Sequence, residues 1–197
     1  MCGIVALIGS QEASPLLIKG LRKLEYRGYD SSGIAIVDNS KNDKLVCLKA
    51  QGKLNNLVNL AEKKSLSGTL GIGHTRWATH GKPEVRNAHP HLDGLKEIAV
   101  VQNGIIENYS DLKNELKSQG VDFISDTDTE VIPHLIAREL KSLLKENSSL
   151  NSALFLQAVQ NILPLLQGSY AFAVVCAQIP DALVLAKRQA PLIIGFG

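Results

Sequence analysis

The chain alternates short apolar runs, each of about the length of one β-strand, with stretches of helical periodicity, and this alternation limits the folds open to it. Residues 33–38 and 44–50 flank a short polar segment rich in Asn, Ser and Lys, as the two strands of a β-hairpin do. Residues 169–177 and 182–188 repeat the arrangement near the other end. Further apolar runs of strand length lie at 3–9, 70–74 and 98–102.

Four stretches between these runs have the spacing of amphipathic helices. One begins at Ser14 and is predicted to end at Gly28. Thr127 and Glu130 predict a capping box before a later helix, with Pro133 just inside that helix. The other two helices are expected at about 54–61 and 151–166. Hairpins with helices grouped between them favour a layered α+β domain over a doubly wound parallel sheet, and stacking two such sheets under helices would give a four-layer αββα sandwich.

Composition excludes several classes of function. The net charge is +2 and no cluster of Lys and Arg stands out, so we expect no nucleic-acid partner. No apolar run approaches the roughly 18 residues of a membrane span, and we expect no contact with a membrane. The chain has three cysteines and no charged leader with a cleavage site. These features predict a cytoplasmic protein with reduced thiols.

Cys2 precedes the first predicted strand, an unusual place for a reactive side chain. If Met1 is removed, Cys2 carries both a thiol and a free α-amine, whose ordinary pKa of roughly 7.7–8.0 lets it act as a base near neutral pH. A nucleophile beside its own amine is a known catalytic arrangement. The alternative is that Cys2 is a small buried apolar side chain.

Asn103 and Gly104 follow the apolar run at 98–102. An Asn-Gly pair after a strand is most often a hairpin turn. It could instead form an oxyanion hole, in which the Asn103 side-chain amide and the Gly104 backbone N–H donate to one oxygen.

Two further segments could hold a small charged ligand. Arg76, followed by Trp77, Thr79 and His80 in a loop with glycines at both ends, suits a carboxylate, although a lone Arg is usually solvated. The Ser, Thr and Asp residues of 125–131 are typical of helix caps. One of their two aspartates could instead hold an ammonium group, and with Arg76 it would grip both ends of a free α-amino acid. The histidines nearby do not have the spacing of a zinc site, and we expect no metal.

Several segments together carry a resemblance to a known family. The chain resembles the glutaminase domain of the glucosamine-6-phosphate synthases, which are class II glutamine amidotransferases. The N-terminal Cys-Gly-Ile and the later Asn-Gly are common to that class, whereas EYRGYDSSG and HTRWATHGKP indicate this member. The resemblance runs from Cys2 to Gly197, on the segments CGIVALIG, LRKLEYRGYDSSGIAIV, GHTRWATHGKPEVRNAHPH, NGIIENYSDLK, SDTDTEVIPHLI and PLIIGFG.

The resemblance implies a fold and a set of roles. The fold is the αββα sandwich of the N-terminal nucleophile hydrolases. Cys2 would be the nucleophile with its α-amine as general base, and Asn103 and Gly104 would form the oxyanion hole. Arg76 would bind the α-carboxylate of glutamine and Asp128 its ammonium group. The remaining residues expected at the substrate site are Trp77, Thr79, His80, Arg27 and Gly28. One departure is Gln102, at a position where the family commonly has a histidine.

The implied activity is hydrolysis of glutamine to glutamate and ammonia without a cofactor. In the whole enzyme the ammonia would convert fructose-6-phosphate to glucosamine-6-phosphate. Residues 2–197 would be a glutaminase domain truncated at its C-terminal end, with the sugar-isomerase domain of the same polypeptide missing and a homodimer as the full-length form. Two alternatives stay open: an amidotransferase or autoprocessing hydrolase with another acceptor, and a non-catalytic glutamine-binding module that makes no use of Cys2.

Overall fold

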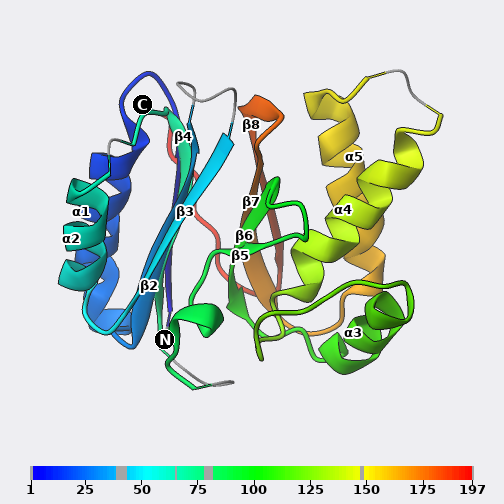
Figure 1. The fold of residues 1–197 in the computed structure, drawn as a ribbon, viewed down its shortest axis with the longest axis horizontal. Coiled ribbons are helices and arrows are strands. Elements are labelled where there is room, and N and C mark those ends of the chain that lie inside the picture. The colour runs from blue at the N-terminus through cyan, green and yellow to red at the C-terminus, as the bar shows by residue number, and fades with distance from the viewer. Residues whose placement is uncertain (1, 39–43, 65, 78–81, 147–148, 197) are drawn as a thin grey trace.

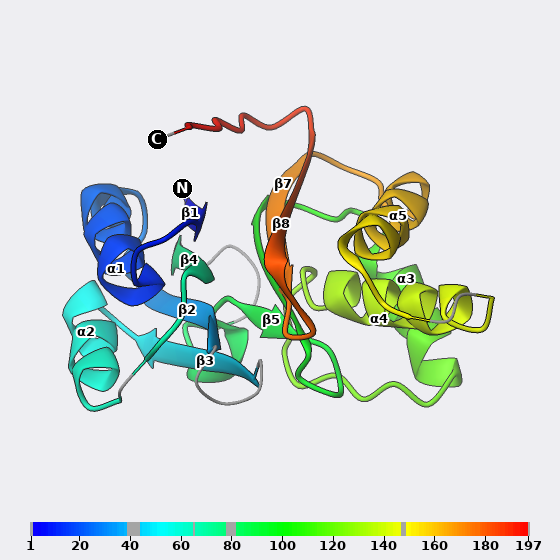
Figure 2. The same cartoon turned by 90° about the horizontal axis from the view of Figure 1, so that it is seen from above.

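The computed structural model describes residues 2–38, 44–64, 66–77, 82–146 and 149–196. Within these residues the strands form two four-stranded antiparallel sheets that stack face to face (Figure 1). Helices cover the outer side of each sheet, so the order of layers is helix, sheet, sheet, helix, and the view from above shows the same order (Figure 2). The predicted α+β sandwich is therefore observed.

The first sheet is built from the N-terminal part of the chain. Helix α1 (Ala13–Leu24), which continues into the short 3-10 helix η1 (Glu25–Arg27), and helix α2 (Leu54–Glu62) cover it. Its strands, in spatial order, are β1 (Gly3–Ile8), β4 (Leu70–Arg76), β2 (Ser31–Asp38) and β3 (Lys44–Gln51).

The second sheet is built from the remainder. The helices on its outer side are α3 (Tyr109–Ser118), α4 (Val131–Leu143) and α5 (Ser152–Ile162). Short 3-10 helices lie at Val85–Asn87 (η3) and Leu163–Leu165 (η4). Its strands, in spatial order, are β5 (His91–Leu92), β6 (Ile98–Gly104), β7 (Tyr170–Cys176) and β8 (Ile179–Arg188).

The layer between the two sheets consists mainly of Ala, Val, Leu and Ile side chains. Because side chains alternate across a strand, every second residue of β4 and β6 points into this layer. On β4 that alternation begins with buried Leu70 and Ile72 and continues to His74 and Arg76. On β6 it begins with Ala99 and Val101 and continues to Asn103. The apolar layer therefore becomes polar at one end, where both strands finish.

Most elements confirm the prediction, and two local interpretations were wrong. Asn103 and Gly104 are not a hairpin turn, because they pair with Ala171 and Tyr170 of β7 as the last residues of β6. The capping box before α4 is also not formed, since the helix begins at Val131 and has no side-chain cap. Within the described residues, no helix is long and apolar enough to cross a membrane.

Candidate active site

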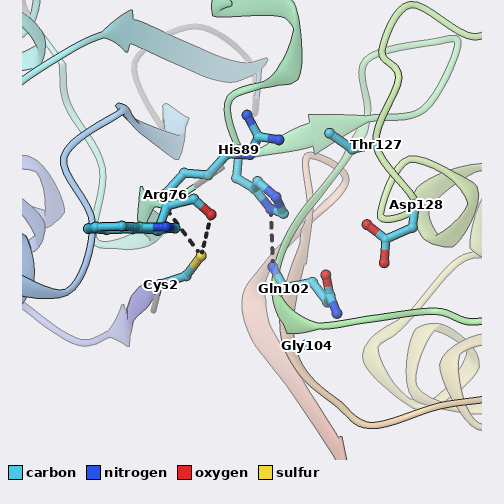
Figure 3. Close-up of a pocket in the computed structure, with 8 residues that line it drawn as sticks. Cys2, Arg76, His89, Gln102, Gly104, Thr127 and Asp128 are labelled. Carbon is cyan, nitrogen blue, oxygen red and sulfur yellow. Dashed lines mark hydrogen bonds between the residues drawn. The ribbon is translucent and has the colours of Figure 1, made fainter. Parts of the chain in front are cut away.

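A pocket opens at the polar end of the layer between the sheets. Figure 3 shows side chains from both sheets around it, with Cys2 on one side and the Asp128 carboxylate on the other. The segments that contribute are the start of β1, the end of β4, the residues just before β5, the end of β6 and the loop before α4. The residues that line the pocket are Cys2, Arg76, Trp77, His89, Gln102, Gly104, Thr127 and Asp128.

Cys2 is half-buried immediately before β1, which fixes the chain end against β4. The Trp77 backbone N–H donates to Cys2 Sγ over 3.3 Å, and Sγ lies 3.7 Å from the Trp77 carbonyl oxygen (Figure 3). These two contacts with the Trp77 backbone hold the Cys2 side chain at the pocket.

The other two cysteines lie in different surroundings. Burial raises the pKa of the Cys47 thiol to about 11, against a smaller opposing effect of Lys49. Burial likewise raises the pKa of the Cys176 thiol to about 11. Neither residue lines the pocket. Because the thiolate is the nucleophilic form, Cys47 and Cys176 are poor nucleophiles at neutral pH.

Arg76 is only 4% exposed, so the interpretation as a solvated surface arginine is wrong. Burial lowers the pKa of its guanidinium, while nearby Cys2, Asp30 and Asp128 act in the opposite direction. One of its terminal nitrogens donates to the Lys82 carbonyl oxygen over 3.4 Å. A buried guanidinium that faces a pocket provides a fixed cationic fork for a carboxylate.

Gly28 allows the segment that follows η1 to pass close to the backbone of Arg76. A Cβ at position 28 would lie 2.7–2.9 Å from backbone atoms of Arg76 and Trp77, so a larger residue would force the strand end to move. Arg27, in η1, is partly buried but is not among the pocket-lining residues. Trp77 is exposed and packs edge-on against Tyr29 at a centroid distance of 5.4 Å. Thr79 and His80 lie outside the described residues.

Asn103 and Gly104 end β6 beside Cys2. The Asn103 side-chain nitrogen donates to the Cys2 carbonyl oxygen over 3.4 Å. Gly104 has φ +114°, and a Cβ there would lie 2.0 Å from the Ser169 carbonyl oxygen, so only glycine fits without distortion. The structure thus places an amide side chain and a glycine backbone beside the nucleophile, the two kinds of donor from which an oxyanion hole can be built.

Of the two aspartates in the 125–131 segment, Asp128 lines the pocket and Asp126 does not. Asp128 is 9% exposed and accepts a hydrogen bond from the Ile106 backbone N–H at 2.7 Å. Asp126 instead forms an exposed ion pair with Arg86 at 2.6 Å. Asp128 is the aspartate that the resemblance indicated, and its role as the partner of an ammonium group stays a prediction.

A buried network of polar side chains lies beside the pocket, and the sequence did not predict it. His74 and His89 stack with ring centroids 4.1 Å apart, and the Gln102 backbone N–H donates to His89 Nδ1 over 3.3 Å. His91 lies 3.0 Å from the Thr127 hydroxyl, and Thr129 donates to the Gln102 side-chain oxygen over 2.7 Å. In the sequence these histidines suggested only metal ligands. In the part of the chain that the structure describes, no group of three or more His, Cys, Asp or Glu could hold a metal.

The chain matches a known family of protein domains. The model of the glutamine amidotransferase domain family matches residues 74–193, a span that contains Arg76, Asn103, Gly104 and Asp128. The chain belongs to this family. Its site thus combines elements from both sheets in a glutamine amidotransferase domain.

Similar curated proteins cover the whole chain. The glutamine–fructose-6-phosphate aminotransferase (isomerizing) of Thermosynechococcus vestitus is 54% identical over 197 residues, and that of Nostoc sp. is 55% identical. The chain spans 30% of the length of each of these relatives.

Two solved structures share the fold. The glutamine phosphoribosylpyrophosphate amidotransferase from B. subtilis has a TM-score of 0.73 and 27% identity, covering 95% of this chain and 37% of its own. A structure described as the allosteric regulatory enzyme of purine biosynthesis has a TM-score of 0.70 and 29% identity, covering 90% of this chain and 36% of its own. The fold is the αββα sandwich of the N-terminal nucleophile hydrolases, as expected.

Proposed function

We propose that this domain hydrolyses the side-chain amide of glutamine to glutamate and ammonia. The observation that carries the proposal is a pocket lined by a thiol, the Gly104 backbone, a buried guanidinium and a buried carboxylate, with the Asn103 amide hydrogen-bonded to Cys2 beside it. These groups come from four separated segments of the chain. The match to the glutamine amidotransferase domain family supports the same reaction.

Glutamine would be held by its two charged ends. Arg76 would pair with the α-carboxylate and Asp128 with the α-ammonium group. Both side chains are largely shielded from water, which strengthens their attraction for the ligand. A ligand gripped at these two points presents its side-chain amide toward Cys2. Thr79 and His80, which follow Arg76 in the sequence, are proposed to line the site, and Trp77 to help close it. Arg27 and Gly28 are proposed to border the site, where Gly28 allows the close packing.

The reaction is acyl transfer through a thioester. The Cys2 thiolate attacks the amide carbon, and Asn103 and Gly104 stabilise the oxyanion that forms. The C–N bond then breaks as the α-ammonium of Cys2 gives its proton to the leaving nitrogen, which releases ammonia. Water, deprotonated by the same amine, hydrolyses the thioester to glutamate and restores the thiol.

The use of the ammonia is inferred from the relatives. The curated proteins that match over the whole of this chain are named glutamine–fructose-6-phosphate aminotransferases. We infer that the ammonia converts fructose-6-phosphate to glucosamine-6-phosphate, in amino-sugar biosynthesis, on a sugar-isomerase part of a longer polypeptide. The homodimer expected from the resemblance stays a prediction.

The nucleophile is tested by comparing two cysteine substitutions in the complete protein. Cys2→Ala should abolish glutamate release and leave glutamine binding largely intact, because Arg76 and Asp128 hold the ligand. Cys47→Ala is the matched control and should keep near-normal turnover. A glutamine-like electrophile should label Cys2 alone, since burial suppresses the other two thiols. Substantial turnover by Cys2→Ala would refute the assignment.

The role of the Cys2 α-amine as general base is tested by keeping Met1 in place. A retained Met1 would convert the Cys2 amine into an amide, which has no useful basicity. Protein in which Met1 removal is blocked, verified by mass spectrometry, should release almost no glutamate while its thermal stability changes little. Near-normal activity with Met1 retained would mean that another group is the base.

A further inference from the structure

We propose that His74 is a positioning residue that orients the Asn103 side chain as an oxyanion donor, an inference that rests on the proposed glutaminase function. The two residues come from different sheets. His74 lies on β4 and Asn103 at the end of β6, and both belong to the alternating set of residues that points into the layer between the sheets. Their side chains meet with His74 Nε2 3.0 Å from Asn103 Oδ1.

The tautomer of His74 follows from its second contact. Nε2 also lies 3.1 Å from the Gln102 backbone carbonyl oxygen. A carbonyl oxygen can only accept a hydrogen bond, so Nε2 must carry the proton. The Asn103 atom that faces the same N–H must then be its oxygen. This leaves the Asn103 nitrogen on the other side of the amide, toward Cys2, whose carbonyl oxygen it reaches at 3.4 Å.

The charge of His74 is as well defined as its tautomer. Burial lowers its pKa to about 4, against opposing hydrogen bonds to Asn103 and Gln102, and Arg76 lowers it further. The ring is therefore neutral at physiological pH and does not repel the cationic Arg76. Its Nδ1 has no hydrogen-bond partner within the described residues, so the ring is held there by the two contacts of Nε2–H, with Gln102 and Asn103. Stacking against His89, with the ring planes 18° apart, fixes the ring orientation.

Two effects on catalysis follow. Without His74 the Asn103 amide could rotate by half a turn and present its oxygen, an acceptor, to the developing oxyanion. A hydrogen bond to the amide oxygen also polarises the amide, which makes its N–H groups stronger donors. Both effects act on the transition state, where the oxyanion forms, and not on the charged ends of glutamine. His74 should therefore affect kcat and leave KM nearly unchanged.

The test is a double-mutant cycle on the complete protein. His74→Leu removes the donor and should lower kcat by about 10- to 100-fold, less than the roughly 100- to 1,000-fold loss from removing an oxyanion donor outright. His74→Gln keeps an N–H near the Nε2 position and should restore much of the activity. In an Asn103→Ala background, His74→Leu should have less than about a twofold further effect, because there is no amide left to orient.

Thr75→Val is the matched control. Thr75 is the next residue of β4, is equally buried and points to the opposite face of the sheet, so its change should leave kcat unaltered. If Asn103→Ala itself keeps full activity, the proposed oxyanion hole is wrong. If Asn103→Ala is impaired and His74→Leu either retains wild-type kcat or adds its full effect to Asn103→Ala, the positioning role of His74 is wrong.

One measurement does not depend on the folding of any variant. The ¹⁵N resonances of His74 in the wild-type protein should show a neutral ring protonated at Nε2 from pH 6 to 8. A ring protonated at Nδ1 only, or a cationic ring, would overturn the proposal.

Discussion

Glu130 anchors the loop that carries Asp128, and its charge should contribute measurably to stability. Its side chain is buried, with one carboxylate oxygen accepting from the Ile124 N–H over 2.8 Å and the other from the Ser125 N–H over 2.6 Å. The Ser125 hydroxyl donates to the second oxygen as well. The perturbation we consider is Glu130→Gln, which keeps the volume but replaces one of these acceptors with a donor.

The contribution of the Glu130 charge to the free energy of unfolding follows from the pKa of that carboxyl group. Burial alone would raise the pKa of Glu130, but the His134 ring, 3.8 Å away, and the hydrogen bonds from Ile124 and Ser125 outweigh it and lower the pKa from 4.5 to about 2. Because the folded pKa is depressed, the stabilisation is fully present above pH 4.5 and is lost as the pH falls through 2. Each pKa unit corresponds to about 1.4 kcal/mol, so the charge contributes about 3 kcal/mol at pH 7 and about 1 kcal/mol at pH 3.

The assay is urea unfolding of the wild type and Glu130→Gln at pH 7 and at pH 3. The difference in the free energy of unfolding between the two proteins should shrink by about 2 kcal/mol at the lower pH. Glu115→Gln is the control, because Glu115 forms an exposed ion pair with Arg138 that should contribute less than about 1 kcal/mol. An equal difference at the two pH values would refute the reasoning, since the loss would then come from packing or a neutral hydrogen bond.

Two further substitutions test the pocket. Arg76→Lys should raise the Kd for glutamine strongly although the charge is kept, because an ammonium cannot make a two-pronged contact with a carboxylate; unchanged affinity by calorimetry would contradict the carboxylate assignment. Gly104→Ala should lower kcat by about 100-fold or more and reduce the free energy of unfolding by more than about 1 kcal/mol, because its Cβ would meet the Ser169 carbonyl oxygen at 2.0 Å. Wild-type kcat in that variant would argue against the backbone donor.

The sequence predicted the elements well because their signals are local. The apolar runs at 3–9, 33–38 and 98–102 became strands β1, β2 and β6, since period and length distinguish them without knowledge of their partners. The predictions that were wrong concerned residues whose contacts lie far away in the sequence. Asn103-Gly104 has the composition of a turn, and only its pairing with β7, almost 70 residues later in the chain, makes it a strand end.

The polar network was beyond sequence reasoning for the same reason. Thr127 and Glu130 have the spacing of a capping box. The Thr127 hydroxyl, however, forms a hydrogen bond with His91, and the Glu130 carboxylate accepts hydrogen bonds from the backbone N–H groups of Ile124 and Ser125. His74 falls on the inner face of β4 by alternation, yet nothing in its neighbours indicates that Asn103 lies opposite. Side chains that bridge two sheets are specified by how the sheets stack, and stacking leaves no periodic signal.

The site draws on both sheets, and this has a consequence for how the domain gains activity. The first sheet supplies Cys2 and Arg76, and the second supplies Asn103, with Asp128 in a loop beside it. Under the proposed mechanism each half of the sandwich supplies one residue that binds glutamine and one that takes part in the reaction. Neither half can therefore hydrolyse glutamine by itself. During refolding, activity should therefore return only when the halves dock, after the secondary structure has formed, which makes glutamate release a reporter of that last assembly step.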